Sequence, residues 1–254
     1  MTAAEERRIL EEEYGFELTE GRLDARGPAK STPAPYDRPK SLLSEETVKM
    51  QPFVVGLGGT LRASSSSETA LRIALDAAEA AGARTELFGA DYLARLPMYD
   101  PERPARVSGR RLVEALRAAD GVIVSSPGYH GSVSGLVKNA LDYAEELRDD
   151  VRPYLTGRAV GCVTTAYGWQ AAVTTLQALR TIVHALRGWP TPLGAAINSA
   201  ESRLGPGGAD ARVTAQLRTV GLEVCGQGGV PRPAGVRGAH QNAASDTDTV
   251  LRMF

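Results

Sequence analysis

The feature that most constrains the fold is a regular alternation of short apolar runs with amphipathic stretches between residues 51 and 226. Apolar runs of strand length occupy residues 52–59, 84–89, 121–126, 158–165 and 193–198. The stretches between and after them repeat apolar residues at helical spacing, as Ala70, Ile73, Ala74 and Ala77 do. Strands that alternate with helices through short connections form a parallel sheet covered on both faces. We therefore predict a doubly wound α/β domain with a five-stranded parallel sheet in a three-layer α/β/α arrangement.

In such a sheet, ligands bind at the carboxyl ends of the strands, near the point where the strand order reverses. The connections after the first, third and fourth predicted strands are therefore the places where functional residues are expected.

The connection after the first strand reads "GGTLRASSSSE" and leads directly into a predicted helix. Exposed N–H groups and the dipole at a helix N-terminus favour an anion. Serine hydroxyls and the Arg62 guanidinium add donors, while both the G-K-[ST] of a P-loop and the G-x-G-x-x-G dinucleotide fingerprint are absent. We predict a site for a terminal phosphate. Ser65 and Glu68 also fit a capping box at the start of that helix. In the alternative interpretation, Ser65 only caps the helix and the other serines are solvated.

The connection after the third strand, "SSPGYHGSVSGL", combines a proline, two glycines near its start, Tyr129 and His130. We expect its backbone to pass close to a planar group, with Ser132 capping the next helix. The alternative is a polar turn with an anchored tyrosine. Lys138 and Asn139 are expected to be solvated helix residues.

The connection after the fourth strand, "TTAYGWQ", offers threonine hydroxyls and aromatic side chains for the edge of a heterocycle. In the helix that follows, Ala172, Leu176, Leu179, Val183 and Leu186 form a seam that suits either core packing or a dimer contact.

Composition excludes several classes of function. The formal net charge of -1 and the lack of a basic stripe argue against nucleic acid, and no Cys/His cluster has metal-ligand spacing. Cys162 and Cys225 are expected to be buried free thiols. The chain shows no apolar leader and no membrane span, so we expect a cytoplasmic protein. Residues 1–50 read as an N-terminal extension or arm, and residues 227–254 as a C-terminal tail.

The first and third connections together resemble two motifs of the NADPH-dependent FMN reductase family, which has a flavodoxin-like fold. The first motif is filled by Gly59, Thr60, Arg62, Ser65 and Ser67. The second is matched by Pro127, Tyr129, Gly131, Ser132, Gly135, Lys138, Asn139, Ala140 and Asp142, with Gly128, His130 and Val137 as departures.

The resemblance implies an NAD(P)H-dependent FMN reductase, with FMN as cofactor and NADPH or NADH as hydride donor. It implies the FMN phosphate on Thr60, Arg62, Ser65 and Ser67. It implies the flavin ring along Pro127, Gly128, Tyr129, His130 and Gly131, and its pyrimidine edge near Thr165, Ala166, Tyr167 and Gly168. No catalytic acid or base is expected, since the flavin carries the reaction.

Three further expectations stay open at the level of sequence. The resemblance implies a homodimer or homotetramer, and it implies a partner flavin-dependent monooxygenase to which the protein supplies reduced flavin. Alternative functions are an FMN-containing reductase of quinones, azo dyes or metal oxyanions, a flavodoxin-type electron carrier, and a non-redox nucleotide-binding module. The near-neutral charge disfavours the electron carrier, because such carriers tend to be strongly acidic.

Overall fold

The computed structural model describes residues 51–62, 65–103 and 107–227. The predicted N-terminal arm lies outside these residues, and so does the predicted tail except for Gln227. Within them, a parallel sheet forms the middle layer, with strands in the order β2-β1-β3-β5. Two further segments, β6 and β7, both pair in parallel with β5 and together occupy the fifth position. The bounds are β1 Phe53–Gly58, β2 Arg84–Phe88, β3 Gly121–Tyr129, β5 Ala159–Ala166, β6 Trp189–Pro190 and β7 Ala195–Asn198.

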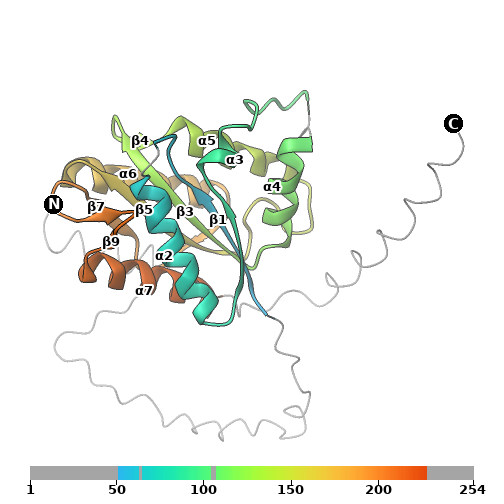
Figure 1. Cartoon of the computed structure of the whole chain (residues 1–254). Helices are drawn as coiled ribbons and strands as arrows, with labels where there is room; N and C mark the ends of the chain where they lie inside the picture. The colour runs from blue at the N-terminus through green and yellow to red at the C-terminus, as the bar shows by residue number, and fades with distance from the viewer. Residues whose placement is uncertain (1–50, 63–64, 104–106, 228–254) are drawn as a thin grey trace, which may run out of the picture. The chain divides into compact units, whose positions relative to one another are not determined.

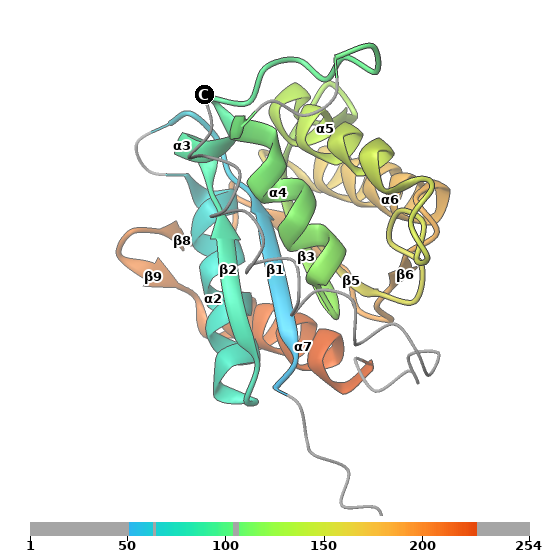
Figure 2. The same cartoon turned by 90° about the vertical axis from the view of Figure 1, so that its right-hand side faces the viewer.

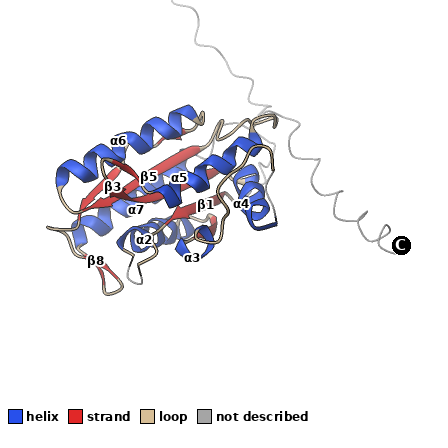
Figure 3. Cartoon of the chain, turned by 90° about the horizontal axis from the view of Figure 1, so that it is seen from above, coloured by secondary structure: helices blue, strands red, loops and turns tan. Residues whose placement is uncertain are grey.

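Helices cover both faces of this sheet (Figures 1 and 3). The alternation of the strands separates two cores: Val55 and Leu57 join the core beneath α4, α5 and α6, whereas Val54 joins the core beneath α2 and α7. The predicted three-layer α/β/α architecture is therefore confirmed. The helix bounds are α2 Ser66–Ala80, α3 Ala90–Leu93, α4 Val107–Ala118, α5 Gly135–Asp142 with the 3₁₀ helix η2 Tyr143–Leu147, α6 Trp169–Ala185 and α7 Ala211–Gln227.

The strand order places the topological switch between β1 and β3, because the chain moves outward to β2 from one side of β1 and to β3 from the other. Figure 2 shows β2, β1 and β3 side by side. Loops that follow β1, β3 and β5 consequently meet at one edge of the sheet, where a ligand is expected in doubly wound folds.

Several local predictions hold and explain where helices begin and end. Ser65 is the N-cap of α2 and accepts a hydrogen bond from the Glu68 N–H at 3.1 Å. Gly82, at φ +95°, ends the helix in the left-handed conformation that glycine favours. The α6 seam packs on the core, with Ala172, Leu179 and Val183 fully buried.

Other local predictions are wrong. The third strand does not end at residue 126 but continues through Pro127 to Tyr129, and the chain then turns into the short antiparallel strand β4, Ser132–Val133. The N-cap of α5 is Ser134 rather than Ser132, because Ser132 is already paired in this hairpin. The two-residue strands β8 (Leu204–Gly205) and β9 (Gly208–Ala209) were likewise not anticipated.

Both cysteines are free, as predicted, but only Cys162 is fully buried; Cys225 is half-buried on α7. Among the described residues, no helix is long and apolar enough to cross a membrane.

Candidate functional site

The loop after β1 is organised around the hydroxyl of Ser65. Its Oγ accepts the backbone N–H of Thr60 at 3.0 Å as well as that of Glu68, and lies 3.1 Å from the Oγ of Ser67. Ser67 is almost fully buried, and Ser66 donates to the carbonyl of Leu204 at 3.1 Å. The interpretation of Ser65 as a helix cap is thus correct, whereas Ser66 and Ser67 are not the solvated serines of the alternative interpretation; Ser64 lies outside the described residues.

Glycine at the end of β1 lets this loop lie directly on β3. Gly58 has φ +151°, and a Cβ there would lie 2.0 Å from the carbonyl oxygen of Ser125. The Gly59 N–H donates to that same carbonyl at 3.3 Å, and the Ser125 hydroxyl donates to the Ser67 carbonyl at 2.7 Å. Gly58, Gly59 and Ser67 are therefore held directly against β3 at the switch point.

Arg62 lies at the outer side of this loop. Its N–H donates to the Thr60 hydroxyl oxygen at 3.3 Å, its side chain is exposed, and it pairs with no acidic group in the part of the chain that the structure describes. The half-buried Glu68 carboxylate is engaged instead by Arg72 at 2.7 Å and by the N–H of Ala90 at 3.1 Å. The only acidic side chain in the first turn of α2 is therefore partly neutralised beside the predicted anion site.

The segment after β3 is a tight hairpin instead of a loop that runs along the sheet edge. His130 and Gly131, with φ of 52° and 83°, form its two-residue turn, a combination typical of a type I′ turn. Tyr129 and His130 are exposed at its end, and open space surrounds Gly131. Gly128 serves packing: a Cβ there would lie 2.6 Å from the Thr175 hydroxyl oxygen of α6.

The loop after β5 brings a third set of predicted residues to the same edge. Thr165 and Ala166 are buried at the end of the strand, and Tyr167 is 86% exposed beyond them. Thr164 is fully buried, and its hydroxyl donates to the carbonyl of Ala172 at 2.9 Å, so it ties β5 to α6. Gly168, with φ +117°, turns the chain into that helix.

Sequence reasoning missed two asparagines that support these segments. Asn139 is buried, contrary to its predicted solvation; its amide donates to the Pro97 carbonyl at 2.9 Å and accepts from the Tyr99 N–H at 2.8 Å. Lys138, in contrast, is exposed as predicted and pairs with Asp142. Asn198, at the end of β7, accepts the Gly168 N–H at 2.8 Å. Its position at the carboxyl end of a predicted strand was the signal that could have identified it.

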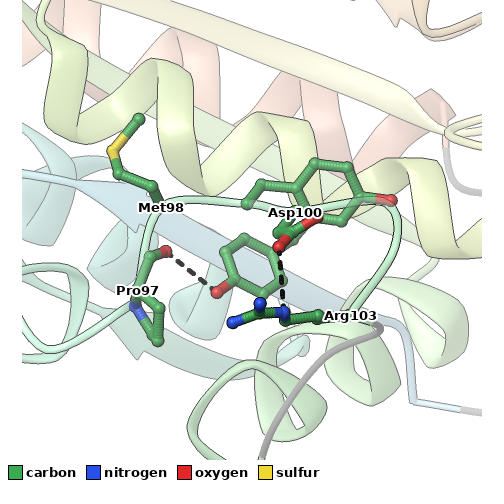
Figure 4. A pocket seen from close by; sticks show the side chains of 6 residues that line it. Pro97, Met98, Asp100 and Arg103 are labelled. Carbon is green, nitrogen blue, oxygen red and sulfur yellow. Dashed lines mark hydrogen bonds and ion pairs between the residues drawn. The ribbon is translucent and has the colours of Figure 1, made fainter.

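A pocket of about 200 Å³ is lined by residues that do not belong to the predicted cofactor set (Figure 4). It is lined by Pro97, Met98, Tyr99, Asp100, Arg103 and Tyr143. Burial raises the pKa of Tyr143, which stays protonated and donates to the Pro97 carbonyl at 3.0 Å. Arg103 and Asp100, both of which line the pocket, pair with each other at 3.6 Å, so their charges are matched internally.

The donor set of the β1 loop fits a phosphomonoester. Serine and threonine hydroxyls, the N-terminus of the fifteen-residue helix α2 and an exposed guanidinium are the groups that bind terminal phosphates. The β3 hairpin and the β5 loop add exposed aromatic side chains and glycines with open space around them. Over the described residues, no group of three or more His, Cys, Asp or Glu side chains could hold a metal ion. The arrangement fits FMN.

Comparison with known proteins agrees with this interpretation. The model of the NADPH-dependent FMN reductase family matches residues 52–202, more than half of the chain. A quinone reductase of Escherichia coli K12 is 34% identical over 121 residues, which cover 45% of this chain and 60% of that protein. An FMN-dependent NADPH-azoreductase of Staphylococcus aureus is 37% identical over 81 residues, covering 32% of this chain and 39% of the relative. The chain thus spans less than two thirds of these curated relatives.

Solved structures agree at the level of the fold. An oxidoreductase from Corynebacterium diphtheriae superposes with a TM-score of 0.55 at 21% identity, over 70% of this chain and 96% of that one. The NAD(P)H:acceptor oxidoreductase FerB from Paracoccus denitrificans gives 0.55 at 23% identity, over 68% and 95%. With the fold, the β1 loop and the family match in agreement, the chain belongs to the NADPH-dependent FMN reductase family of flavodoxin-like flavin oxidoreductases.

Proposed function

We propose that this protein is an NAD(P)H-dependent FMN reductase that transfers hydride from NADPH or NADH to FMN. The observation that carries the proposal is the preformed β1 loop, in which Ser65, Ser67 and the start of α2 lie together above the switch point. When bound, FMN would supply the chemistry, by accepting a hydride and passing electrons on.

The residues of the chain would bind FMN and orient it. The hydroxyls of Thr60, Ser65 and Ser67 and the guanidinium of Arg62 would hold the phosphate in our proposal. Two of these groups are already fixed by internal hydrogen bonds, so little ordering is needed on binding.

The other two segments would place the flavin ring. The β3–β4 hairpin and the β5 loop flank the same edge of the sheet, with Tyr129 and Tyr167 exposed there. No side chain is assigned a proton transfer. His130 is exposed in the hairpin turn and is treated as part of the rim of the site.

A second candidate, an FMN-containing reductase of quinones or azo dyes, is favoured by the curated relatives, which are described as a quinone reductase and an azoreductase. Steady-state turnover distinguishes these two candidate functions. NADPH and NADH oxidation are followed with FMN alone and then with catalytic FMN plus a quinone or an azo dye. Oxidation that scales with FMN alone supports the first function. Oxidation that needs the second acceptor supports the other, and FMN binding without oxidation would point to an electron carrier.

The proposal extends to a cytoplasmic homodimer or homotetramer that passes reduced flavin to a partner monooxygenase. Exposed aromatic side chains near the site, Tyr129, Tyr167 and Trp169, support a protein contact at this edge. Sedimentation of the purified chain tests the assembly, and a single species at the monomer mass would refute it.

A further inference from the structure

The segment after β7 contacts two of the three loops of the candidate site. It runs from Asn198 to the strand pair β8–β9, and β8 packs beside α2 (Figure 2). At its far end, the carbonyl of Leu204 accepts the hydroxyl of Ser66, one residue from the centre of the β1 loop. At its near end it holds the β5 loop. We call residues 198–204 the brace.

Asn198 is the residue that ties the brace to the β5 loop. Its side chain is only 2% exposed, and its Oδ1 accepts the N–H groups of Gly168 at 2.8 Å and Ala200 at 3.0 Å. Its Nδ2 donates to Oε1 of Glu201 at 2.8 Å. A buried amide with these bonds has one orientation, because reversing it would set donor against donor and acceptor against acceptor.

Glu201 continues the network to the first residue of α6. Its Oε2 accepts the indole N–H of Trp169 at 2.9 Å, so one carboxylate joins Asn198 to Trp169. Ser199 adds two bonds, from its N–H at 2.9 Å and its hydroxyl at 3.0 Å, both to the carbonyl of Ala166. Both ends of the Ala166–Trp169 turn are thus held by the brace.

These contacts decide what the β5 loop can offer a ligand. The Gly168 N–H is already used by Asn198, so Gly168 contributes the shape of the turn, at φ +117°, and no donor. A glycine with open space around it adopts many conformations unless its neighbours are held. The position of Tyr167 therefore depends on the bonds on either side of it.

We propose that Asn198 and Glu201 are positioning residues for the flavin ring: their hydrogen-bonded pair fixes the Ala166–Trp169 turn in the geometry that binds the pyrimidine edge. This inference rests on the proposed function. It assigns a role to residues outside the motifs that carry the family resemblance.

The polarity of the pair allows a reciprocal test. Asn198→Asp alone sets a carboxylate against the Glu201 carboxylate. Glu201→Gln alone leaves one glutamine oxygen for two donors, so its NH₂ group must face either the Asn198 NH₂ or the indole N–H of Trp169. In the double variant Asn198→Asp/Glu201→Gln, the new carboxylate accepts both backbone N–H groups and the new glutamine N–H, and the glutamine oxygen accepts the Trp169 indole. Every bond is restored, and only the bond between the two side chains has its direction reversed.

The experiment measures dissociation constants for FMN and for riboflavin by quenching of flavin fluorescence, with melting temperature as the check of folding. Each single variant is expected to raise the dissociation constants of both flavins by the same factor, roughly five- to tenfold. The factor is the same because the variants disturb the contact with the flavin ring, which both ligands have, and not the contact with the phosphate. The double variant should return to within about twofold of the natural protein. Glu114→Gln, at an exposed position on α4, is the matched control for loss of one carboxylate and should bind like the natural protein.

Trp169→Phe provides a second route if a single variant does not fold. It removes only the indole donor to Glu201 and should weaken both flavins by about two- to threefold. If the natural protein does not bind FMN, the proposed function fails. If it binds FMN and the single variants and Trp169→Phe all bind both flavins as tightly, or the double variant is no better than the singles, the positioning role is refuted while the proposed function stands.

Discussion

Replacing Ser65 by alanine should separate the two tasks that its hydroxyl performs. In the structure the Oγ accepts two backbone N–H groups, from Thr60 and Glu68. Loss of the helix cap costs about 1 kcal/mol, and the orphaned, half-buried Thr60 N–H costs about 1 kcal/mol more. The free energy of unfolding should therefore fall by about 2 kcal/mol, which lowers the melting temperature of a domain of this size by about 4–8 °C.

The same variant should weaken the binding of FMN more than the binding of riboflavin. Because the Ser65 oxygen accepts from the backbone, its single proton is available either to Ser67 or to a phosphate oxygen. Losing one donor to a charged group costs about 1.5 kcal/mol, or about tenfold in the dissociation constant of FMN. Riboflavin has no phosphate, so its dissociation constant should rise by less than about threefold. Equilibrium titration of both flavins well below the melting temperature measures the difference.

Ser134→Ala is the matched control. Ser134 is likewise a serine N-cap, of α5, although it is buried, and its Oγ accepts the Val137 N–H at 3.2 Å. This variant should lose stability, and any change in its affinity should be the same for FMN and for riboflavin. Equal losses for the two flavins in Ser65→Ala would show that the β1 loop does not hold the phosphate, and the reasoning would be refuted.

Three further predictions concern other parts of the described chain. Arg62→Ala should weaken FMN markedly, by about tenfold or more, and leave the melting temperature unchanged because the side chain is exposed; unaltered FMN affinity would remove it from the phosphate site. Gly58→Ala should destabilise the domain by about 3 kcal/mol or more in denaturant titration, since its Cβ would lie 2.0 Å from the Ser125 carbonyl oxygen; a soluble variant of natural stability would contradict the tight path of the loop. Burial raises the pKa of the Cys162 thiol to about 12, above its ordinary value of 9.0, so its contribution to stability should be complete below pH 9 and lost as the pH rises towards 12. At pH 8 a thiol reagent should modify the half-buried Cys225 first, and prior modification of Cys162 would contradict this order.

The fold followed from the sequence because its strongest signals are local. Strand and helix periodicity located the five sheet positions, and serine and glycine chemistry located both ends of α2. The β3–β4 hairpin was not foreseen for a physical reason: Pro127 and Gly128 are unusual in a strand interior, and the hairpin depends on the positive φ of His130, a residue that seldom adopts it.

Of the candidate site, the sequence predicted which segments meet but not how they are held. The packing role of Gly128 was not foreseen: its lack of a Cβ makes room for the Thr175 hydroxyl. Asn139 looked solvated on its helix and instead supports the segment that begins at Pro97. The Asn198–Gly168 bond joins residues thirty positions apart, and such pairings are set by sheet register, which periodicity does not specify.

The central claim is that the chain binds FMN through the β1 loop and that a reduced nicotinamide reaches the bound flavin. The most direct measurement mixes the FMN-loaded protein with NADPH, and separately with NADH, in the absence of oxygen and follows the visible absorbance of the flavin. We expect the absorbance to bleach at a rate that saturates with the nicotinamide concentration and that is lower for Ser65→Ala assayed at the same FMN concentration. Retention of the oxidised flavin spectrum in protein shown to bind FMN would contradict it.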